Sequence, residues 1–169
     1  MLLADKRVDP SANNNSAVKF ASKNGHSEIV ELLLADKRVD PSARDNRAIK
    51  DASENGHLKV VELLLADKRV DPSADDNWAV QCASANGYSE IVELLLADKR
   101  VDPSADDNWA VKHASMNGHS EIVELLLTDE RVDPSSNDNW AVQLASANGH
   151  SEIVELLLAD ERVDLPILN

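Results

Sequence analysis

Residues 24–34 read NGHSEIVELLL, and the same letters return at residues 117–127 and 148–158. A closely similar stretch surrounds each of the other two glycines, so every glycine of the chain marks one copy of the same unit. These glycines lie 31 residues apart, at Gly25, Gly56, Gly87, Gly118 and Gly149. Such a period predicts a solenoid, in which each unit buries its apolar face against its neighbours.

The repeats account for almost the whole chain, and we interpret residues 1–169 as a single repeat domain. Residues 1–12 resemble the end of an incomplete copy, and residues 165–169 break the pattern. Between them lie the five copies, numbered one to five: 13–43, 44–74, 75–105, 106–136 and 137–164.

Each copy predicts two short helices and a turn. In copy one, helix one is expected at about 15–23 and stops at Asn24-Gly25, because glycine readily adopts the left-handed conformation that ends a helix. Helix two is expected at about 27–35, and the sequence around Pro41 predicts an extended turn. Helices this short are marginal in water. They must therefore be stabilised by packing against neighbouring copies.

The segment 24–34 and its repeats resemble the second helix of ankyrin repeats, and Ala21 before Asn24-Gly25 fits the first helix. The resemblance covers residues 2–164. It implies an all-α fold, an ankyrin-type α-solenoid of stacked helix-turn-helix repeats with short connecting turns. It also implies protruding turns and a concave surface that recognises other proteins.

Two features depart from the family pattern. Ankyrin units usually contain about 33 residues, so these shorter units predict a shorter finger between copies, without a regular β-hairpin. The Thr-Pro-Leu-His opening of the family is also missing. Asparagines precede helix one at the matching places, and their side chains are expected to cap that helix: Asn46, Asn77, Asn108 and Asn139.

Four positions of helix one differ most between copies, and their spacing of i, i+3, i+4 and i+7 places them on one helix face. Constant residues such as Ala17, Val18 and Ala21 fall on the other side. We therefore expect the constant face to pack and the variable face to look outward. From copy one to copy five, the first variable position holds Ser16, Arg47, Trp78, Trp109 and Trp140; the second Lys19, Lys50, Gln81, Lys112 and Gln143; the third Phe20, Asp51, Cys82, His113 and Leu144; and the fourth Lys23, Glu54, Ala85, Met116 and Ala147.

In the ankyrin arrangement a row of such helix faces lines the concave side, so these positions supply the candidate partner-binding residues. The row is centred on Trp78, Trp109, Lys112 and Met116. Tryptophan is enriched among the residues that dominate binding energy, but three tryptophans in register also fit a structural ladder of stacked rings. Both interpretations stay open. The candidates, taken from copies two to five, are Arg47, Lys50, Glu54, Trp78, Gln81, Ala85, Trp109, Lys112, Met116, Trp140, Gln143 and Ala147.

Composition narrows the classes of partner. The net charge of −14 argues against nucleic acid, whose phosphates require clustered Lys and Arg, and is compatible with a basic protein partner. No apolar run is long enough to span a membrane. A single cysteine, Cys82, excludes an internal disulfide and fits a reducing compartment. An intracellular, cytoplasmic location is expected.

The residues that suggest chemistry are better explained by structure. His26, His57, His119 and His150 follow the glycines, but Tyr88 replaces the imidazole in copy three, so a hydrogen-bonding turn residue is favoured. The acidic turn that begins at Asp71 lacks the glycine and glutamate of a calcium loop, because Asp76 and Cys82 stand in their places. We therefore predict no catalytic residue, no metal site and no cofactor.

The sequence therefore favours a non-catalytic module that binds a protein partner on its concave, helix-one and turn surface. The alternative is a structural spacer, or a fragment of a larger protein whose activity lies elsewhere. Neither terminus carries a clearly polar capping copy. Leu2, Leu3 and residues 156–158 are therefore expected to be partly exposed, giving a monomer that frays at its ends or associates weakly end to end.

Overall fold

A computed structural model describes residues 8–163. Over this range the chain forms ten helices and no strand, so each copy contributes one helix pair. Helix one of successive copies is α1, α3, α5, α7 and α9, and helix two is α2, α4, α6, α8 and α10. Their bounds are α1 Ala12–Lys23, α2 Ser27–Leu34, α3 Ala43–Glu54, α4 Leu58–Leu65, α5 Ala74–Asn86, α6 Ser89–Leu96, α7 Ala105–Asn117, α8 Ser120–Leu127, α9 Ser136–Ala147 and α10 Ser151–Leu158.

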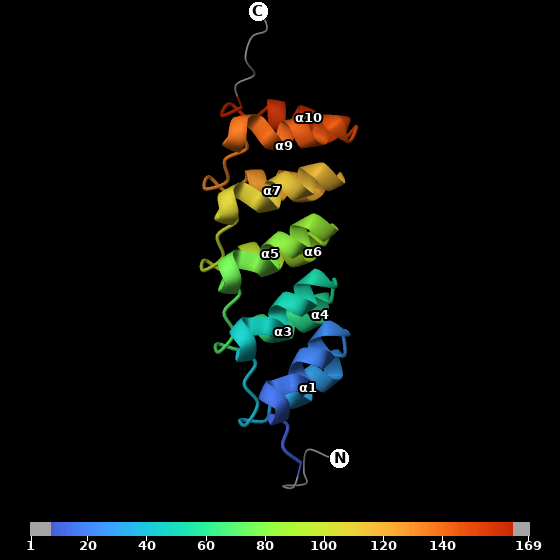
Figure 1. Ribbon diagram of the computed structural model, residues 1–169, viewed down its shortest axis with the longest axis vertical. Coiled ribbons are helices and arrows are strands. Elements are labelled where there is room, and N and C mark those ends of the chain that lie inside the picture. The colour runs from blue at the N-terminus through green and yellow to red at the C-terminus, as the bar shows by residue number, and fades with distance from the viewer. Residues whose placement is uncertain (1–7, 164–169) are drawn as a thin grey trace, which may run out of the picture.

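The helix pairs stack in chain order into one elongated column (Figure 1). Each helix one packs on the helix one of the next copy, and each helix two packs on the next helix two less extensively. The all-α solenoid predicted from the repeat is confirmed. The prediction that the finger between copies lacks a β-hairpin is also confirmed within the described residues.

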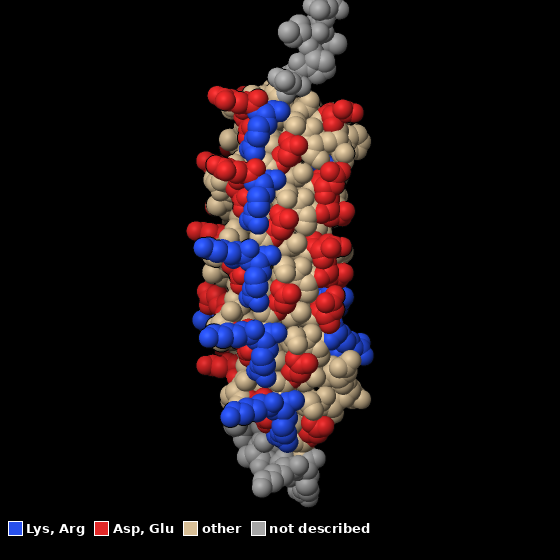
Figure 2. Space-filling view, turned by 90° about the vertical axis from the view of Figure 1, so that its left-hand side faces the viewer, with Lys and Arg blue, Asp and Glu red and all other residues tan. Residues whose placement is uncertain are grey.

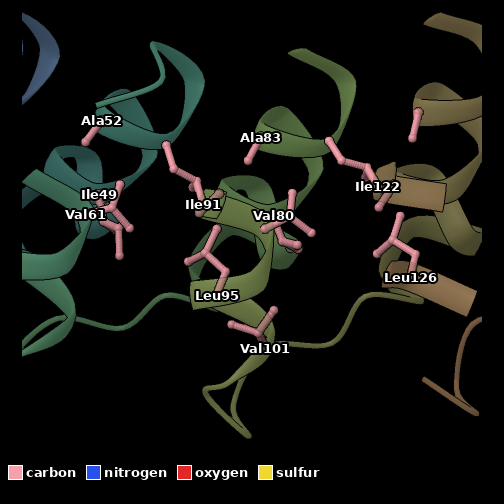
Figure 3. Close-up of a cluster of buried hydrophobic side chains, with 14 of the residues drawn as sticks. Ile49, Ala52, Val61, Val80, Ala83, Ile91, Leu95, Val101, Ile122 and Leu126 are labelled. Carbon is pink, nitrogen blue, oxygen red and sulfur yellow. The ribbon is translucent and has the colours of Figure 1, made fainter. Parts of the chain in front are cut away.

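A continuous apolar core runs between the two rows of helices (Figure 3). In copy three, Val80 and Ala83 of helix one face Ile91 and Leu95 of helix two, and Val101 closes the core below them. All five side chains are fully buried. Burying an isoleucine or leucine of this kind contributes about 1.5–3 kcal/mol. Since one cluster of buried side chains runs through all five copies, no copy has a core of its own.

Helix one begins with an element that the sequence analysis missed. In each copy three consecutive residues have φ between 50° and 64°, the left-handed region, before the right-handed helix starts. Asn and Asp are the residues besides glycine that most readily adopt this conformation, and they fill all but one of these places. In copy three the turn is closed by a hydrogen bond from the Asn77 backbone amide to the Ser73 carbonyl oxygen, 2.9 Å long. The left-handed residues are 13–15, 44–46, 75–77, 106–108 and 137–139.

The asparagine that ends this turn binds the last turn of its own copy instead of capping its helix. The Oδ1 atom of Asn77 accepts a 2.7 Å hydrogen bond from the backbone amide of Asp102, near the end of copy three. Asn46 and Asn108 make the same bond to the ends of their own copies, and no side-chain cap is formed at the start of helices α3, α5 and α7. The capping prediction was therefore wrong for these three residues, because the left-handed turn points their side chains at the turn that leads to the next copy.

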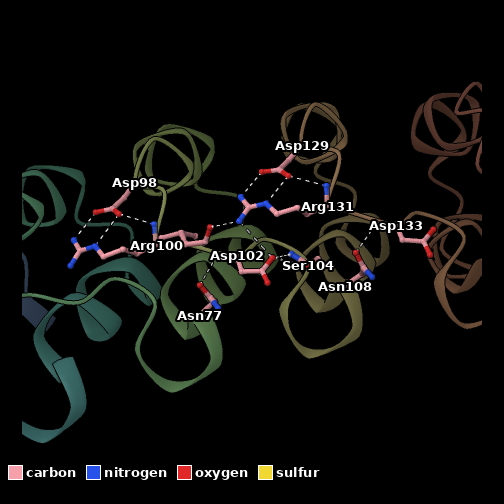
Figure 4. A network of polar contacts seen from close by, with 10 residues as sticks. Asn77, Asp98, Arg100, Asp102, Ser104, Asn108, Asp129, Arg131 and Asp133 are labelled. Atoms are coloured by element: carbon pink, nitrogen blue, oxygen red, sulfur yellow. Dashed lines mark hydrogen bonds and ion pairs between the residues drawn. The ribbon is translucent and has the colours of Figure 1, made fainter.

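An arginine clamp links adjacent copies (Figure 4). Arg131 donates from Nε and Nη2 to the carboxylate of Asp129, and from Nη1 to the carbonyl oxygen of Val101 in the preceding copy, 3.1 Å away. Figure 2 shows a column of basic side chains running along the stack, between acidic ones. The arginines that reach back in this way are Arg38, Arg69, Arg100, Arg131 and Arg162.

His57, His119 and His150 form another link between copies, which confirms the predicted hydrogen-bonding turn role for these three histidines. His57 Nε2 lies 2.9 Å from the carbonyl oxygen of Lys23 at the end of α1, and the carbonyl can only accept, so Nε2 donates. The ring also lies over Gly25, where an added Cβ would be 2.6 Å from Nδ1. Glycine is thus required twice, by its φ of +71° and by the packed ring. His119 and His150 repeat the hydrogen bond in later copies.

Candidate functional site

The first and fourth variable positions of helix one look outward as predicted. Trp78 and Trp140 are 38% and 46% exposed, and Trp109 is half-buried. The ring of Trp109 stacks on His113 of its own helix, with centroids 3.5 Å apart and planes 14° apart. No ring contact between tryptophans occurs in the described part of the chain. The remaining candidates at these two positions are also exposed or half-buried: Arg47, Glu54, Ala85, Met116 and Ala147.

The second variable position does not look outward in the middle of the stack. Lys50, Gln81 and Lys112 are buried, whereas Gln143 of the last copy is exposed. This position lies where one helix one packs on the next, so a following copy covers it. The expectation that all four variable positions face solvent is corrected here.

Buried Gln81 and Lys112 donate hydrogen bonds to carbonyl oxygens of the turn that precedes their own helix. Gln81 Nε2 donates a 2.8 Å hydrogen bond to the carbonyl oxygen of Asp76, and Lys112 donates to the carbonyl oxygen of Asp107. Lys50 instead forms ion pairs with carboxylates, and its Nζ atom lies 2.8 Å from Asp75 Oδ2. These side chains therefore hold the left-handed turns in place, a role that the pattern of variation did not reveal.

The third variable position is mostly covered. Asp51 is buried and forms an ion pair with Arg47, whose Nη2 atom lies 2.8 Å from Asp51 Oδ1. Cys82 is also buried, and this burial, reinforced by the charge of Glu54, raises the pKa of its thiol to about 11. A thiol with so high a pKa is almost entirely protonated at neutral pH, and the thiolate is the reactive form.

The variable positions of copies one and two line one pocket between α1 and α3. Its volume is about 660 Å³. The lining is rich in cations, in contrast to the net charge of the chain. Sequence reasoning found Arg47 and Lys50 but missed the contributions of copy one and Arg44; the available signal was a cluster of Lys and Arg confined to these two helices. The lining residues are Asn13, Ser16, Lys19, Phe20, Lys23, Arg44, Arg47, Lys50 and Asp51.

The left-handed turns of copies three and four are acidic, unlike the basic pocket between α1 and α3. Asp75, Asp76, Asp106 and Asp107 occupy the left-handed turns of copies three and four, and all four are exposed. Asn137 of the next copy and Ser136 at the end of copy four donate hydrogen bonds to Asp107, and together with nearby Lys112 they lower its pKa. The surface formed by the helix-one row and its turns, here called the helix-one face, therefore changes from basic to acidic along the stack.

Across residues 8–163, no three His, Cys, Asp or Glu side chains are grouped closely enough to hold a metal ion. Within the same residues, no helix is both long enough and apolar enough to cross a membrane.

Comparison with known families gives one result. The model for ankyrin repeats, which represents three copies of the unit, matches residues 1–76 and again residues 77–167. No curated protein matches the chain.

Proposed function

The chain belongs to the ankyrin repeat family, and we propose that it is a non-catalytic module that binds a protein partner along its helix-one face. Ankyrin repeats are generally protein–protein interaction modules. The observation that carries the proposal is the contrast within helix one. Residues that build the core and the links are nearly constant between copies, while the exposed fourth position varies along the stack and the first holds Ser16, Arg47 and then tryptophan in copies three to five.

The partner-facing residues of this proposal are those at the first and fourth positions of copies two to five. Trp78 and Trp140 offer large, partly exposed rings, which suit the centre of an interface. Lys50, Gln81 and Lys112 act indirectly by fixing the turns, since they are buried. The proposed contact residues are Arg47, Glu54, Trp78, Ala85, Trp109, Met116, Trp140 and Ala147, with Gln143 beside them in the last copy.

The chemistry of the turns indicates the kind of partner that meets copies three and four. Exposed carboxylates at Asp75, Asp76, Asp106 and Asp107 flank the tryptophans there. A partner with a basic rim is complementary to this region and should associate faster at low ionic strength. The proposal includes an intracellular, cytoplasmic location, supported by the single cysteine, which is buried and can form no internal disulfide.

A pull-down from cell lysate, followed by titration of the partner it identifies, tests this function. Trp109→Ala and Met116→Glu should weaken binding at least about tenfold, because residues of this type dominate interfaces. Lys99→Gln is the control for Met116→Glu, because it changes net charge by the same amount on an exposed turn after helix two. Thermal melts of the same variants should show intact folding.

Two outcomes would contradict the proposal. If Trp109→Ala lowers the melting temperature while binding survives, the tryptophan row is structural and the binding surface lies elsewhere. If no captured partner binds the unmodified chain more tightly than the Met116→Glu variant, the spacer interpretation is favoured.

A further inference from the structure

The pocket between α1 and α3 contains positive charge that the protein does not neutralise. Within the described residues, no hydrogen bond or ion pair engages the side chains of Lys19, Lys23 or Arg44. The other two cations of the lining are already paired, Arg47 with Asp51 and Lys50 with Asp75. Three free cations therefore converge on one pocket in a chain whose net charge is −14.

Lys19 shows most clearly that this charge lacks a partner. It is only 8% exposed, and its burial and the nearby charge of Arg44 lower its pKa. The charge of Asp51 opposes this shift, but Asp51 is already paired with Arg47. Lys50 occupies the same position one copy later and has Asp45 and Asp75 as carboxylate partners. The equivalent places around Lys19 hold Asn14 and Arg44, so neither supplies a carboxylate. An anion from outside the chain would fill this role for Lys19.

An exposed aromatic ring adjoins these cations. Phe20 lines the same pocket and is 65% exposed, whereas the equivalent Asp51 and Cys82 of the next two copies are buried. A ligand that matches this lining combines anionic groups with an apolar group. Inorganic phosphate offers only the first of these.

The rest of the helix-one face distinguishes between anionic macromolecules. A nucleic acid is an extended polyanion, and if it continued along the stack its phosphates would meet the exposed carboxylates of Asp75, Asp76, Asp106 and Asp107. A short acidic peptide ends before that point, and its side chains supply both carboxylates and apolar groups.

We infer that the pocket between α1 and α3 binds an acidic segment of a partner protein, one with a large apolar side chain beside its carboxylates. This inference deepens the proposed function and rests on it, since it names the part of a partner that meets the first two copies. The carboxylates pair with Lys19, Lys23 and Arg44, and the apolar side chain packs on Phe20. Charge-assisted hydrogen bonds of this kind are the stronger ones in proteins.

Fluorescence anisotropy with the full chain and a short fluorescein-labelled peptide of alternating glutamate and leucine tests the inference. The double variant Lys23→Glu with Arg44→Asp reverses two charges using residues that other copies already have there, Glu54 and Asp75. Its Kd for the peptide should rise at least about tenfold. The matched control, Lys68→Glu with Lys99→Glu, makes the same change in net charge on exposed turns, where copies four and five already have glutamate. That control should leave Kd within about twofold, because screening weakens distant charges.

Two competitors and a second peptide identify the ligand class. Replacing leucine by serine in the peptide should weaken binding, and neither inorganic phosphate nor single-stranded DNA should displace the peptide efficiently. Equal weakening by the two double variants would overturn the inference, because it would show a response to net charge alone. Efficient displacement by DNA or phosphate would also overturn it. Trp109 lies outside the pocket lining, so Trp109→Ala tests the proposed function without altering the peptide site, and the two proposals can fail separately.

Discussion

Helix two of copy one and helix two of copy three have the same sequence, SEIVELLL, but different surroundings. In α2, Ile29 is 49% exposed, and in α6 the equivalent Ile91 is 1% exposed. The side chain and its helix are identical, so the difference comes from the preceding helix pair, which covers Ile91, whereas no helix pair precedes α1 within the described residues. A residue in this protein is therefore buried by its neighbours in the stack more than by its own helix.

The last copy shows the same effect in the other direction. Leu96 at the end of α6 is half-buried, whereas the equivalent Leu158 of α10 is 40% exposed. The isoleucine thus depends on the preceding copy and this leucine on the following one. Leu2 and Leu3, also expected to be exposed, lie outside the described residues. Fraying or weak end-to-end association remains a prediction for both ends, and the apolar exposure of Ile29 and Leu158 supports it.

The largest expected effect comes from truncating the isoleucine in the two settings. Ile91→Ala should lower the free energy of unfolding by about 2–5 kcal/mol, the usual cost of a fully buried isoleucine. Ile29→Ala removes the same atoms from a half-exposed site and should cost about 1 kcal/mol or less. Urea denaturation of both variants gives the two values. Equal losses would break the comparison, since they would mean that a complete neighbour contributes nothing.

The glycines offer a second matched pair. An alanine Cβ at position 118 would lie 2.7 Å from Cε1 of His150, but at position 149 it would meet no atom within 4 Å. Both residues have φ near +80°, at 84° and 78°. Gly149→Ala should therefore cost about 1 kcal/mol, the strain of a left-handed alanine less its effect on the unfolded chain.

Gly118→Ala should cost at least about 1 kcal/mol more, because the His150 ring must also move away from the carbonyl oxygen of Met116. Thermal melts of the two alanine variants measure this difference. His150→Ala in the Gly118→Ala background is the control, and it should remove most of the additional cost. A difference that persists without the ring would mean that the contact between copies is not its source.

The arginine clamp should give the smallest effect and should not distinguish the middle from the end. Hydrogen bonds from Arg38 lower the pKa of Asp36 to about 2, and the equivalent arginines lower the pKa of Asp98 and Asp160. A carboxyl whose pKa is lowered by folding stabilises the protein above its unfolded pKa, near 4. That stabilisation is lost as pH falls through the folded pKa. Stability should therefore decline between about pH 4 and about pH 2.

Asp98→Asn and Asp160→Asn should each flatten this decline slightly and by similar amounts. Their arginines are 46% and 37% exposed, so each pair contributes at most about 1 kcal/mol. Urea midpoints measured across the pH range provide the test. A much larger effect at Asp98 would show that the clamp, like the core, depends on position in the stack.

The sequence predicted the parts of the fold that each copy specifies locally. The glycines located the ends of helix one, the segment around residues 27–34 located helix two, and the loss of the imidazole at Tyr88 indicated a turn role for the histidines. Each of these inferences depends on one residue type with one strong conformational preference.

The predictions that failed concerned contacts between residues far apart in the sequence. Asn77 was expected to cap its own helix, but three consecutive left-handed residues aim it at Asp102, at the other end of its copy. Asn and Asp usually adopt that conformation singly, so a run of three was not expected. Lys50 and Gln81 vary between copies and still are buried, because variation indicates only that a position tolerates change. The basic pocket was missed because it needs side chains from two copies to converge.

Hydrogen exchange of the intact chain tests the central claim, that neighbouring copies supply the stability of each copy. Residues 27–34 and 89–96 have identical sequences, so their amides have nearly the same intrinsic exchange rates, and any difference in protection reports their surroundings. We expect clearly stronger protection in 89–96, and in the identical segment 120–127, than in 27–34. Equal protection in all three segments would contradict it.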